Sequence, residues 1–258
     1  NTGETSIDRR NGLTFSTQVI THPDADFGQV SFPGADVALI ALADPLADLP
    51  TYSMLFSPVS VGEHVSLAAY GGHGIGSTGD VGIDGKRQAG ENILGMVGSQ
   101  NDFLRGLDNS SATFFGAPDG DQIMYFIDFD NPDRTGDECQ RRSNEDAVAF
   151  GVGGVQCVDW TNGAFLNDSL FLGGPSNDFF ADDALENEAG TAGGDSGSPL
   201  FFDEVNGELL IGGVLSGGFT FVTFPGSGYG DVSYYTSLFQ YHQFIEEANP
   251  LKYMSAVE

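Results

Sequence analysis

The stretch GGDSGSPL, Gly193–Leu200, places a serine inside a glycine-rich turn. Glycines at positions 194 and 197 permit a tight backbone turn that a Cβ atom would obstruct. In such a turn we expect the amides of Gly194 and Ser196 to point into one concavity. There they would hold an oxyanion while the Ser196 hydroxyl attacks a carbonyl. We expect the Asp195 carboxylate to turn inward and to need a cationic partner.

This stretch resembles the GDSGGP nucleophile motif of the chymotrypsin/trypsin-like serine proteases, with Ser198 in place of the second glycine. The resemblance implies an all-β fold, the chymotrypsin-like double β-barrel with a C-terminal helix. It also implies hydrolysis of peptide bonds through an acyl-enzyme, with Ser196 as the nucleophile. The alternative is a glycine-rich hairpin that contains a serine by chance, and a six-residue near-match argues against it.

Two segments upstream of the serine follow the family order. GADVALIAL, Gly34–Leu42, is a polar entry followed by an apolar, β-favouring run, so we expect Asp36 at the start of a buried strand. The segment resembles the family's DIALL strand, which implies that Asp36 orients the catalytic histidine. The alternative is a strand-entry aspartate that bonds local amides. VITHPDAD, which begins at Val19, resembles the family segment that precedes this aspartate.

Downstream of the serine, the sequence predicts a β-hairpin and then, from YYTSLFQYHQFIEEANP, a strand that turns into an amphipathic helix. LLIGGVLSGGF, Leu209–Phe219, resembles the family strand that hydrogen-bonds the substrate backbone, which implies a substrate-binding role for Ser216, Gly217 and Gly218. The family alignment places the floor of the primary pocket at Gly190. Glycine there argues against cleavage after Arg or Lys and favours large apolar or aromatic side chains.

The general base of such a site is missing from the recognised motifs. A serine nucleophile needs an imidazole within hydrogen-bond reach, and the family supplies it from a TAAHC-like segment that this chain lacks. We expect structural or surface roles for all four histidines of the chain: His22, His64, His73 and His242. The beginning, Asn1-Thr-Gly-Glu, also differs from the IVGG-like start whose free amine pairs with the family counterpart of Asp195.

We therefore interpret residues 1–258 as a single trypsin-like protease domain that lacks its N-terminal strands. Residues 1–70 would be the remainder of the first barrel, 71–127 linker loops and the start of the second barrel, and 128–258 the second barrel with an acidic insertion and the terminal helix. The catalytic histidine would belong to an N-terminal fragment of the same precursor, associated as a second chain. The alternative is an inactive homologue that serves as a binding or scaffold protein.

Composition narrows the class of protein. With 37 glycines and 21 phenylalanines among 258 residues, the sequence favours many short strands and turns. A net charge of -28 at pH 7 argues against nucleic-acid or anionic-membrane partners, since it repels phosphate. No apolar run approaches the roughly 18 residues of a membrane span. We expect a secreted protein of a saline environment, where salt screens self-repulsion. Protein or peptide substrates are what the resemblance to the serine proteases implies.

The two cysteines, Cys139 and Cys157, form an even pair in a loop-rich region, and we expect one disulfide between them. Two separate buried thiols are the alternative. The segment DFDNPDRTGDE, Asp128–Glu138, gathers acidic oxygens that suit Ca²⁺, but it lacks the glycine and spacing of an EF-hand loop. A solvated acidic loop is favoured, and we expect no metal or other cofactor.

Two other motifs compete with the protease interpretation. GIGSTG, Gly74–Gly79, matches the dinucleotide pattern G-x-G-x-x-G, but no helix is expected after it, so we expect a flexible loop. The order Ser196, Asp231, His242 matches an α/β-hydrolase triad. That fold requires a helix directly after the serine, and the sequence predicts a β-hairpin there.

Overall fold

Strands make up most of the computed structural model, as the sequence predicts, and a short helix stands near its C-terminal end. The structure describes residues 4–8, 14–25, 35–42, 49–99, 103, 122–132, 155–159, 164–168, 180, 184–203, 207–220 and 226–249. The strands in these ranges are β1 (Glu4–Asp8), β2 (Thr14–Thr21), β3 (Ala38–Leu42), β4 (Ser53–Met54), β5 (His64–Ala69), β6 (Gly72–Ile75), β7 (Gly79–Ile83), β8 (Gln88–Ile93), β9 (Met96–Gly98), β10 (Met124–Asp128), β11 (Val155–Asp159), β12 (Ala164–Asp168), β13 (Pro199–Asp203), β14 (Leu209–Phe219) and β15 (Val232–Ser237). A 3₁₀ turn, η2 (Leu238–Tyr241), leads into the helix α4 (His242–Ala248).

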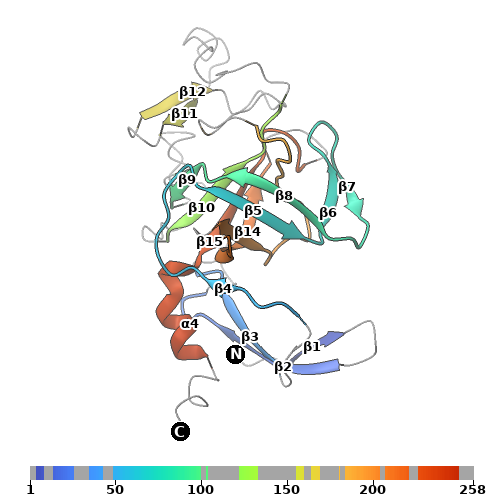
Figure 1. Ribbon diagram of the computed structural model, residues 1–258, viewed down its shortest axis with the longest axis vertical. Coiled ribbons are helices and arrows are strands. Elements are labelled where there is room, and N and C mark those ends of the chain that lie inside the picture. Colours follow the sequence, from blue (N-terminus) through green and yellow to red (C-terminus); the bar gives the residue numbers. More distant parts are fainter. Residues whose placement is uncertain are drawn as a thin grey trace.

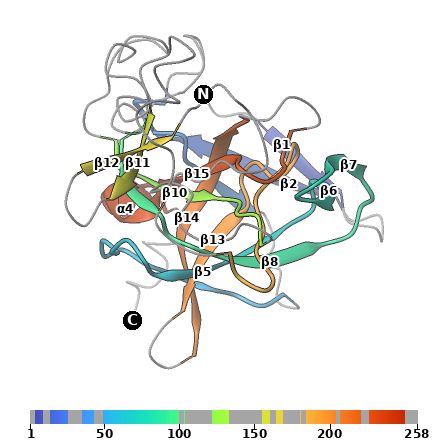
Figure 2. The same ribbon diagram turned by 90° about the horizontal axis from the view of Figure 1, so that it is seen from above.

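A curled, half-barrel sheet dominates the structure (Figures 1 and 2). Its strands follow the order β8-β5-β13-β14-β15-β10-β9, all antiparallel, with β4 added in parallel to one end of β14. The two edge strands, β8 and β9, are separated in sequence only by Leu94 and Gly95. Because two residues span only a few ångströms, the sheet must curl until its edges approach each other.

The core fills the inside of this curl. One cluster combines aliphatic and aromatic side chains from most of the strands: Val65, Leu67, Leu94, Tyr125, Ile127, Leu200, Phe202, Leu215 and Tyr235. Residues on the other face of β10 and β15 are buried as well, because Phe126 packs on Phe103 and Tyr234 packs on Phe219. Both strands are therefore buried along their whole length.

A second, three-stranded sheet, β1-β2-β3, lies below the first in Figure 1, on the side where α4 packs. Ala35 and Val37, just before β3, are buried against Leu238, Tyr241 and Ile245 of the C-terminal turn and helix. The predicted strand that turns into a helix is confirmed here, and its apolar face covers the approach to β3.

Two sequence-based expectations, a buried strand after Asp36 and a flexible loop at residues 74–79, differ from the structure. The strand after Asp36 is not buried among the described residues, since Ile40 is 55% exposed, because β3 is an edge strand that pairs only with β2 there. The expected division at residue 70 stays a prediction, and β5, which ends just before it, pairs with both β13 and β8 of the large sheet. The loop expected at 74–79 belongs to a hairpin of β6 and β7, which close through Gly79 at φ 68°.

Burial of the large sheet's core generates a stability prediction. Replacing Ile127, which is fully buried in β10, by alanine is expected to lower the free energy of unfolding by about 2–5 kcal/mol, because it leaves a cavity. The matched control is Ile83→Ala in β7, whose side chain is 66% exposed; its expected effect is within about 0.5 kcal/mol. Urea unfolding of both variants measures the difference, and equal losses would contradict the assigned core.

Candidate active site

Ser196 stands exposed at the apex of two consecutive backbone turns. The Asp195 amide donates to the Ala192 carbonyl at 3.1 Å, and the Ser198 amide donates to the Asp195 carbonyl at 2.9 Å. Gly194 and Gly197 adopt φ values of 96° and 84°, which an L-residue with a Cβ rarely reaches. The glycines on both sides of the serine are therefore required by the local backbone, as the motif predicts.

The buried carboxylate of Asp195 holds this turn in place. Its Oδ1 accepts a hydrogen bond from the Gly71 amide at 2.6 Å, and its Oδ2 accepts one from the Ala192 amide at 2.8 Å. The side chain turns inward, as expected, and 8% of the residue is exposed. Among the described residues, backbone amides satisfy the carboxylate in place of the cationic partner that the sequence suggested.

Gly71 and Gly72, at the junction of β5 and β6, hydrogen-bond the serine turn, and sequence analysis gave them no role. The Gly72 amide donates to the Gly193 carbonyl at 2.9 Å, next to the bond from Gly71 to Asp195. A Cβ atom on Gly71 would lie 2.6 Å from the Asp195 nitrogen and 2.7 Å from its Cγ. The only signal for this contact in the sequence is a pair of glycines directly after an apolar strand.

The backbone amides at the apex remain available for a ligand. Within the described residues, neither the Gly194 amide nor the Ser196 amide donates to an acceptor of the protein. Gly197 and Ser198 bond instead to Leu215 on β14, through Gly197 N to Leu215 O at 2.9 Å and Leu215 N to Ser198 O at 2.8 Å. The turn is thus bonded to the segment after β5 and to β14, while the amides of Gly194 and Ser196 have no acceptor among the described residues.

Asp36 lies beside the same strand, although 180 residues separate it from its partner. The Ser216 hydroxyl donates to Asp36 Oδ2 at 2.8 Å. The pairing of β14 with β15 shifts register between Leu215 and Gly217, so Ser216 is the extra residue of a β-bulge, a device that re-aims a side chain. Ser216 directly follows Leu215, which holds the serine turn. Asp36 is therefore hydrogen-bonded to the residue that directly follows Leu215, the residue that bonds the serine turn.

The backbone makes a tight turn at Asp36, which helps to hold its side chain in this position. Ala35 adopts a φ of 54°, and the Val37 amide donates to the Ala35 carbonyl at 2.7 Å, which makes a three-residue turn centred on Asp36. A non-glycine residue in this region costs of order 1 kcal/mol and persists only where packing enforces it. Burial of Ala35 and Val37 against the C-terminal helix provides that packing.

All four histidines lie among the described residues, and their rings engage other groups. His22 packs edge-on against Tyr241 and Phe244, with ring centroids 5.3 and 4.9 Å apart, and its Nδ1 accepts from the Asp24 amide. His242 Nδ1 lies 3.0 Å from the carbonyl of Phe239.

The other two histidines belong to strands of the sheets. His64 lies between Glu91 and Asp203, at 3.1 and 3.0 Å. His73 Nδ1 contacts the Gly82 carbonyl within the β6–β7 hairpin. None of the four rings has a hydrogen bond to Asp36 or Ser196 in the described structure. Among the described residues, no histidine is therefore hydrogen-bonded to the serine as a base.

A pocket of about 180 Å³ opens next to the serine turn, between residues 190–193 and 217–220. An apolar cavity of about 150 Å³ is large enough to bind benzene, so this volume admits an aromatic ring. Phe129 and Phe219 supply aromatic walls. At one side, the hydroxyls of Thr191 and Ser233 hydrogen-bond each other at 2.8 Å, a pair that sequence analysis did not identify.

The glycines predicted to bind substrate line this pocket and are sterically required. A Cβ on Gly190 would press on the Phe129 ring at 3.2 Å, and one on Gly218 would lie 2.9 Å from the Val232 carbonyl. Gly217 faces the Tyr234 ring in the same way. Asp231 also lines the pocket, with Oδ2 bonded to the amides of Ser227 and Gly228 at 2.6 and 3.2 Å.

A second cavity, of about 320 Å³, lies on the inner side of the turn. Asp195 and Asp80 line it, together with His73 and the backbone of residues 187–192. Its walls carry carboxylates without a lysine or arginine among the lining residues, so it suits a cationic group.

Several sequence-based expectations fall outside the described residues. Cys139 and residues 133–138 of the acidic segment are among them, so the disulfide and the acidic loop stay predictions.

In the described part of the chain, no three His, Cys, Asp or Glu residues gather as metal ligands, and no helix there has the length and apolarity of a membrane span.

The α/β-hydrolase alternative fails in the structure. A strand, β13, follows Ser196 where that fold requires a helix, and β13 pairs antiparallel with β14, which confirms the predicted hairpin. The dinucleotide alternative fails for a similar reason, because β7 follows the glycines of residues 74–79.

The clasp at Gly71 generates a prediction. Gly71→Ala is expected to lower the free energy of unfolding by about 1–3 kcal/mol, because the new methyl group forces the Asp195 turn away from β5. The matched control is Gly193→Ala in the same turn, where a Cβ has no neighbour within 4 Å. Urea unfolding measures both, and a neutral Gly71→Ala variant would contradict the role of the clasp.

Comparison with known proteins assigns no family to the chain. No protein-family model matches the sequence, and no curated protein matches it. A functional interpretation therefore rests on the geometry of the serine turn, on Asp36 and the adjoining pocket, and on the motif resemblance.

Proposed function

We propose that this chain is the larger part of a secreted serine endopeptidase with the chymotrypsin-like double β-barrel. The observation that carries the proposal is the hydrogen bond from Ser216 to Asp36 at 2.8 Å. It brings a carboxylate from the N-terminal sheet to the strand that anchors the turn of Ser196. A carboxylate and a serine that approach one site from distant segments are the two ends of a serine–base–acid triad.

In the proposed reaction, the Ser196 oxygen attacks the carbonyl carbon of the scissile peptide while a histidine takes the hydroxyl proton. The carbonyl π electrons move to its oxygen, and the amides of Gly194 and Ser196 stabilise that oxyanion. The C–N bond then breaks, and the amine leaves with the proton from the histidine. Water attacks the resulting ester by the same route, releases the acid and restores the serine.

The base would come from a histidine outside these four, on a further segment of the precursor that stays associated as a companion chain. The open side of β3, with Ile40 exposed, is consistent with additional strands of a first barrel. The cavity lined by Asp195 and Asp80 suits an amine of such a segment. A net charge of -28 supports secretion into a saline medium.

The second candidate is an inactive homologue that binds protein partners. The observation in its favour is that none of the four histidine rings contacts Asp36 or Ser196. Against it stand the exposed Ser196 and the two available amides beside it, which a binding protein has no physical need to keep.

A fluorophosphonate probe tests the proposal. In a sample whose intact mass reveals a companion chain, Ser196 is expected to be labelled, because the probe reacts only with an activated serine. Asp36→Asn should slow labelling by about 10⁴-fold, the effect of losing the orienting carboxylate. Ser196→Ala should abolish labelling. Ser198→Ala, two residues away in the same turn, should label as the wild type does, and absence of label with the companion present would refute the enzyme.

The pocket beside the serine turn supports cleavage after large apolar or aromatic residues. Its volume of about 180 Å³ admits a ring, and Phe129 and Phe219 provide apolar contact. The hydroxyl pair of Thr191 and Ser233 adds a polar, uncharged surface that suits a tyrosine hydroxyl. The carboxylate of Asp231 is the charge that lines the pocket, and two backbone amides already hold its Oδ2.

Peptides that vary the residue before the scissile bond test this specificity. We expect kcat/KM after Phe, Tyr or Leu to exceed that after Arg or Lys by about tenfold or more, since a buried ring contributes more than about 1.4 kcal/mol. Asp231→Asn should leave this order unchanged. Cleavage only after Arg and Lys, lost in Asp231→Asn, would show that Asp231 sets the specificity and would overturn the apolar assignment.

A further inference from the structure

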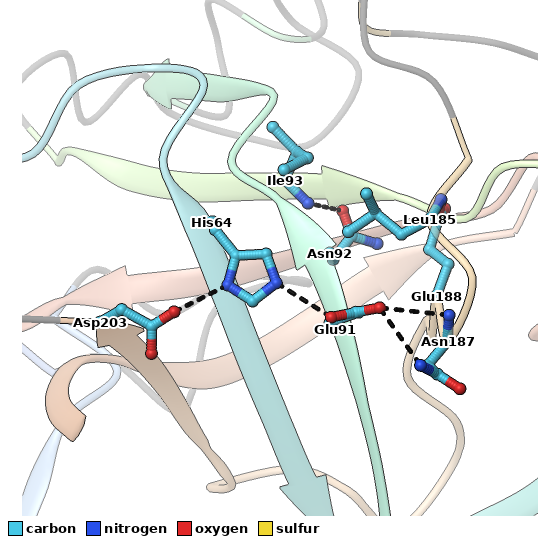
Figure 3. Close-up of polar contacts among 8 residues, drawn as sticks. All are labelled: His64, Glu91, Asn92, Ile93, Leu185, Asn187, Glu188 and Asp203. Atoms are coloured by element: carbon cyan, nitrogen blue, oxygen red, sulfur yellow. Dashed lines mark hydrogen bonds and ion pairs between the residues drawn. The ribbon is translucent and has the colours of Figure 1, made fainter. Parts of the chain in front are cut away.

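His64 on β5 lies between the carboxylates of Glu91 and Asp203 (Figure 3). Its Nε2 is 3.1 Å from Glu91 Oε2 on β8, and its Nδ1 is 3.0 Å from Asp203 Oδ2 on β13. A neutral imidazole carries one N–H, whereas the protonated ring donates through both nitrogens. Two carboxylate partners at hydrogen-bond distance therefore fit the imidazolium and not the neutral ring.

Glu91 also hydrogen-bonds the segment that lines the two pockets. Its Oε1 accepts the Asn187 backbone amide at 3.2 Å, on the side opposite His64 (Figure 3). The backbones also pair, with Glu91 N to Asn187 O at 3.0 Å and Ala189 N to Glu91 O at 3.0 Å. Asn187 and Ala189 belong to the segment 184–192, which lines the inner cavity and ends in the wall of the pocket beside Ser196.

Carboxylates surround the His64 ring, and its positive charge offsets theirs. Glu91 from β8 and Asp203 from β13 act on the ring directly. Beyond Glu91 lies Glu188, paired with it across a β-bridge, whose carboxylate accepts the amides of Leu185 and Asp130. Without the imidazolium, the carboxylates of Glu91 and Asp203 would lose the positive charge that lies between them. Like charges at such distances weaken the contact.

We propose that His64 is a pH-dependent positioning residue. Its imidazolium, shared by Glu91 and Asp203, fastens the segment 184–192 to β8 and thereby sets the wall of the pocket beside Ser196. The effect on cleavage rests on the proposed function, while the fastening of the segment does not.

The pKa directions give the pH range of this contact. Burial lowers the pKa of His64, but the hydrogen bonds and charges of Glu91 and Asp203 outweigh it, so the pKa lies above its usual value of about 6.5. The hydrogen bond from His64 lowers the pKa of Glu91. Stabilisation from the raised histidine pKa is complete below about pH 6.5 and is lost as the pH rises through the folded value. The pair is therefore strongest in mildly acidic solution, while Glu91 is still ionised.

Amide hydrogen exchange tests the fastening without any need for activity. In the wild type, protection of the Asn187 and Ala189 amides, corrected for intrinsic rates, should fall about two- to fivefold between about pH 5.5 and about pH 8.5, the range that partly exposed ion pairs contribute. In His64→Gln, protection should be low and independent of pH. His242→Gln is the matched control and should follow the wild type, because its ring contacts Phe239 and Phe56, neither of which belongs to β8 or to the segment 184–192.

A second variant and a kinetic readout complete the test. Asp203→Asn removes one charge beside the ring, so the midpoint of the protection change should move to lower pH, together with the imidazole titration seen by NMR. If the enzyme is active, KM for a peptide with an aromatic residue before the scissile bond should rise with pH in the wild type but not in His64→Gln, with kcat little changed.

The outcomes separate the two proposals. Protection independent of pH in the wild type, or His64→Gln behaving as the wild type, would overturn the role of His64. Failure of fluorophosphonate labelling with the exchange pattern intact would contradict the proposed peptidase and leave the positioning role standing. An unchanged midpoint in Asp203→Asn would also overturn the proposal, even if His64→Gln failed to fold.

Discussion

The buried carboxylate of Asp195 is the contact on which the candidate site depends. It accepts amides from Gly71 and Ala192, and so joins the end of β5 to the turn that carries Ser196. A carboxylate this buried must be hydrogen-bonded, since an unsatisfied charge would cost far more than the turn contributes. Its two bonds explain both the orientation of the turn and the need for glycine at position 71.

Strand β14 contacts the other parts of the candidate site. Its Leu215 bonds Gly197 and Ser198 of the serine turn, and its bulged Ser216 donates a hydrogen bond to Asp36, just before β3. Its glycines then form one edge of the pocket, where any side chain would collide with β15. A single strand in the middle of the large sheet thus contacts the turn of Ser196, the carboxylate of Asp36 and the pocket. Rigid regular structure positions such groups more closely than loops do.

The parts of the fold and of the candidate site that could be predicted from the sequence are those that depend on neighbouring residues. The glycines around Ser196, the hairpin after it and the strand that turns into α4 all follow from residues close in sequence, and the structure has each of them. The exposure of Ile40, the clasp by Gly71 and the pair of Thr191 with Ser233 were not foreseen. Each depends on a partner, or on the absence of one, that lies far away along the chain.

The sequence by itself determined the local features of the candidate site: a serine in a turn that requires glycine, and an aspartate at the start of a strand. It also determined the mostly β character and the strong negative charge of the chain. Turn geometry and strand alternation are short-range properties, because they depend on the φ preferences and periodicity of neighbouring residues. The tertiary structure decided that Asp195 bonds backbone amides, that Asp36 meets Ser216, and that His64 lies between two carboxylates. Apart from the local bond to the Ala192 amide, those contacts join segments far apart in sequence, so they arise only when the strands assemble and bring these segments within hydrogen-bond distance.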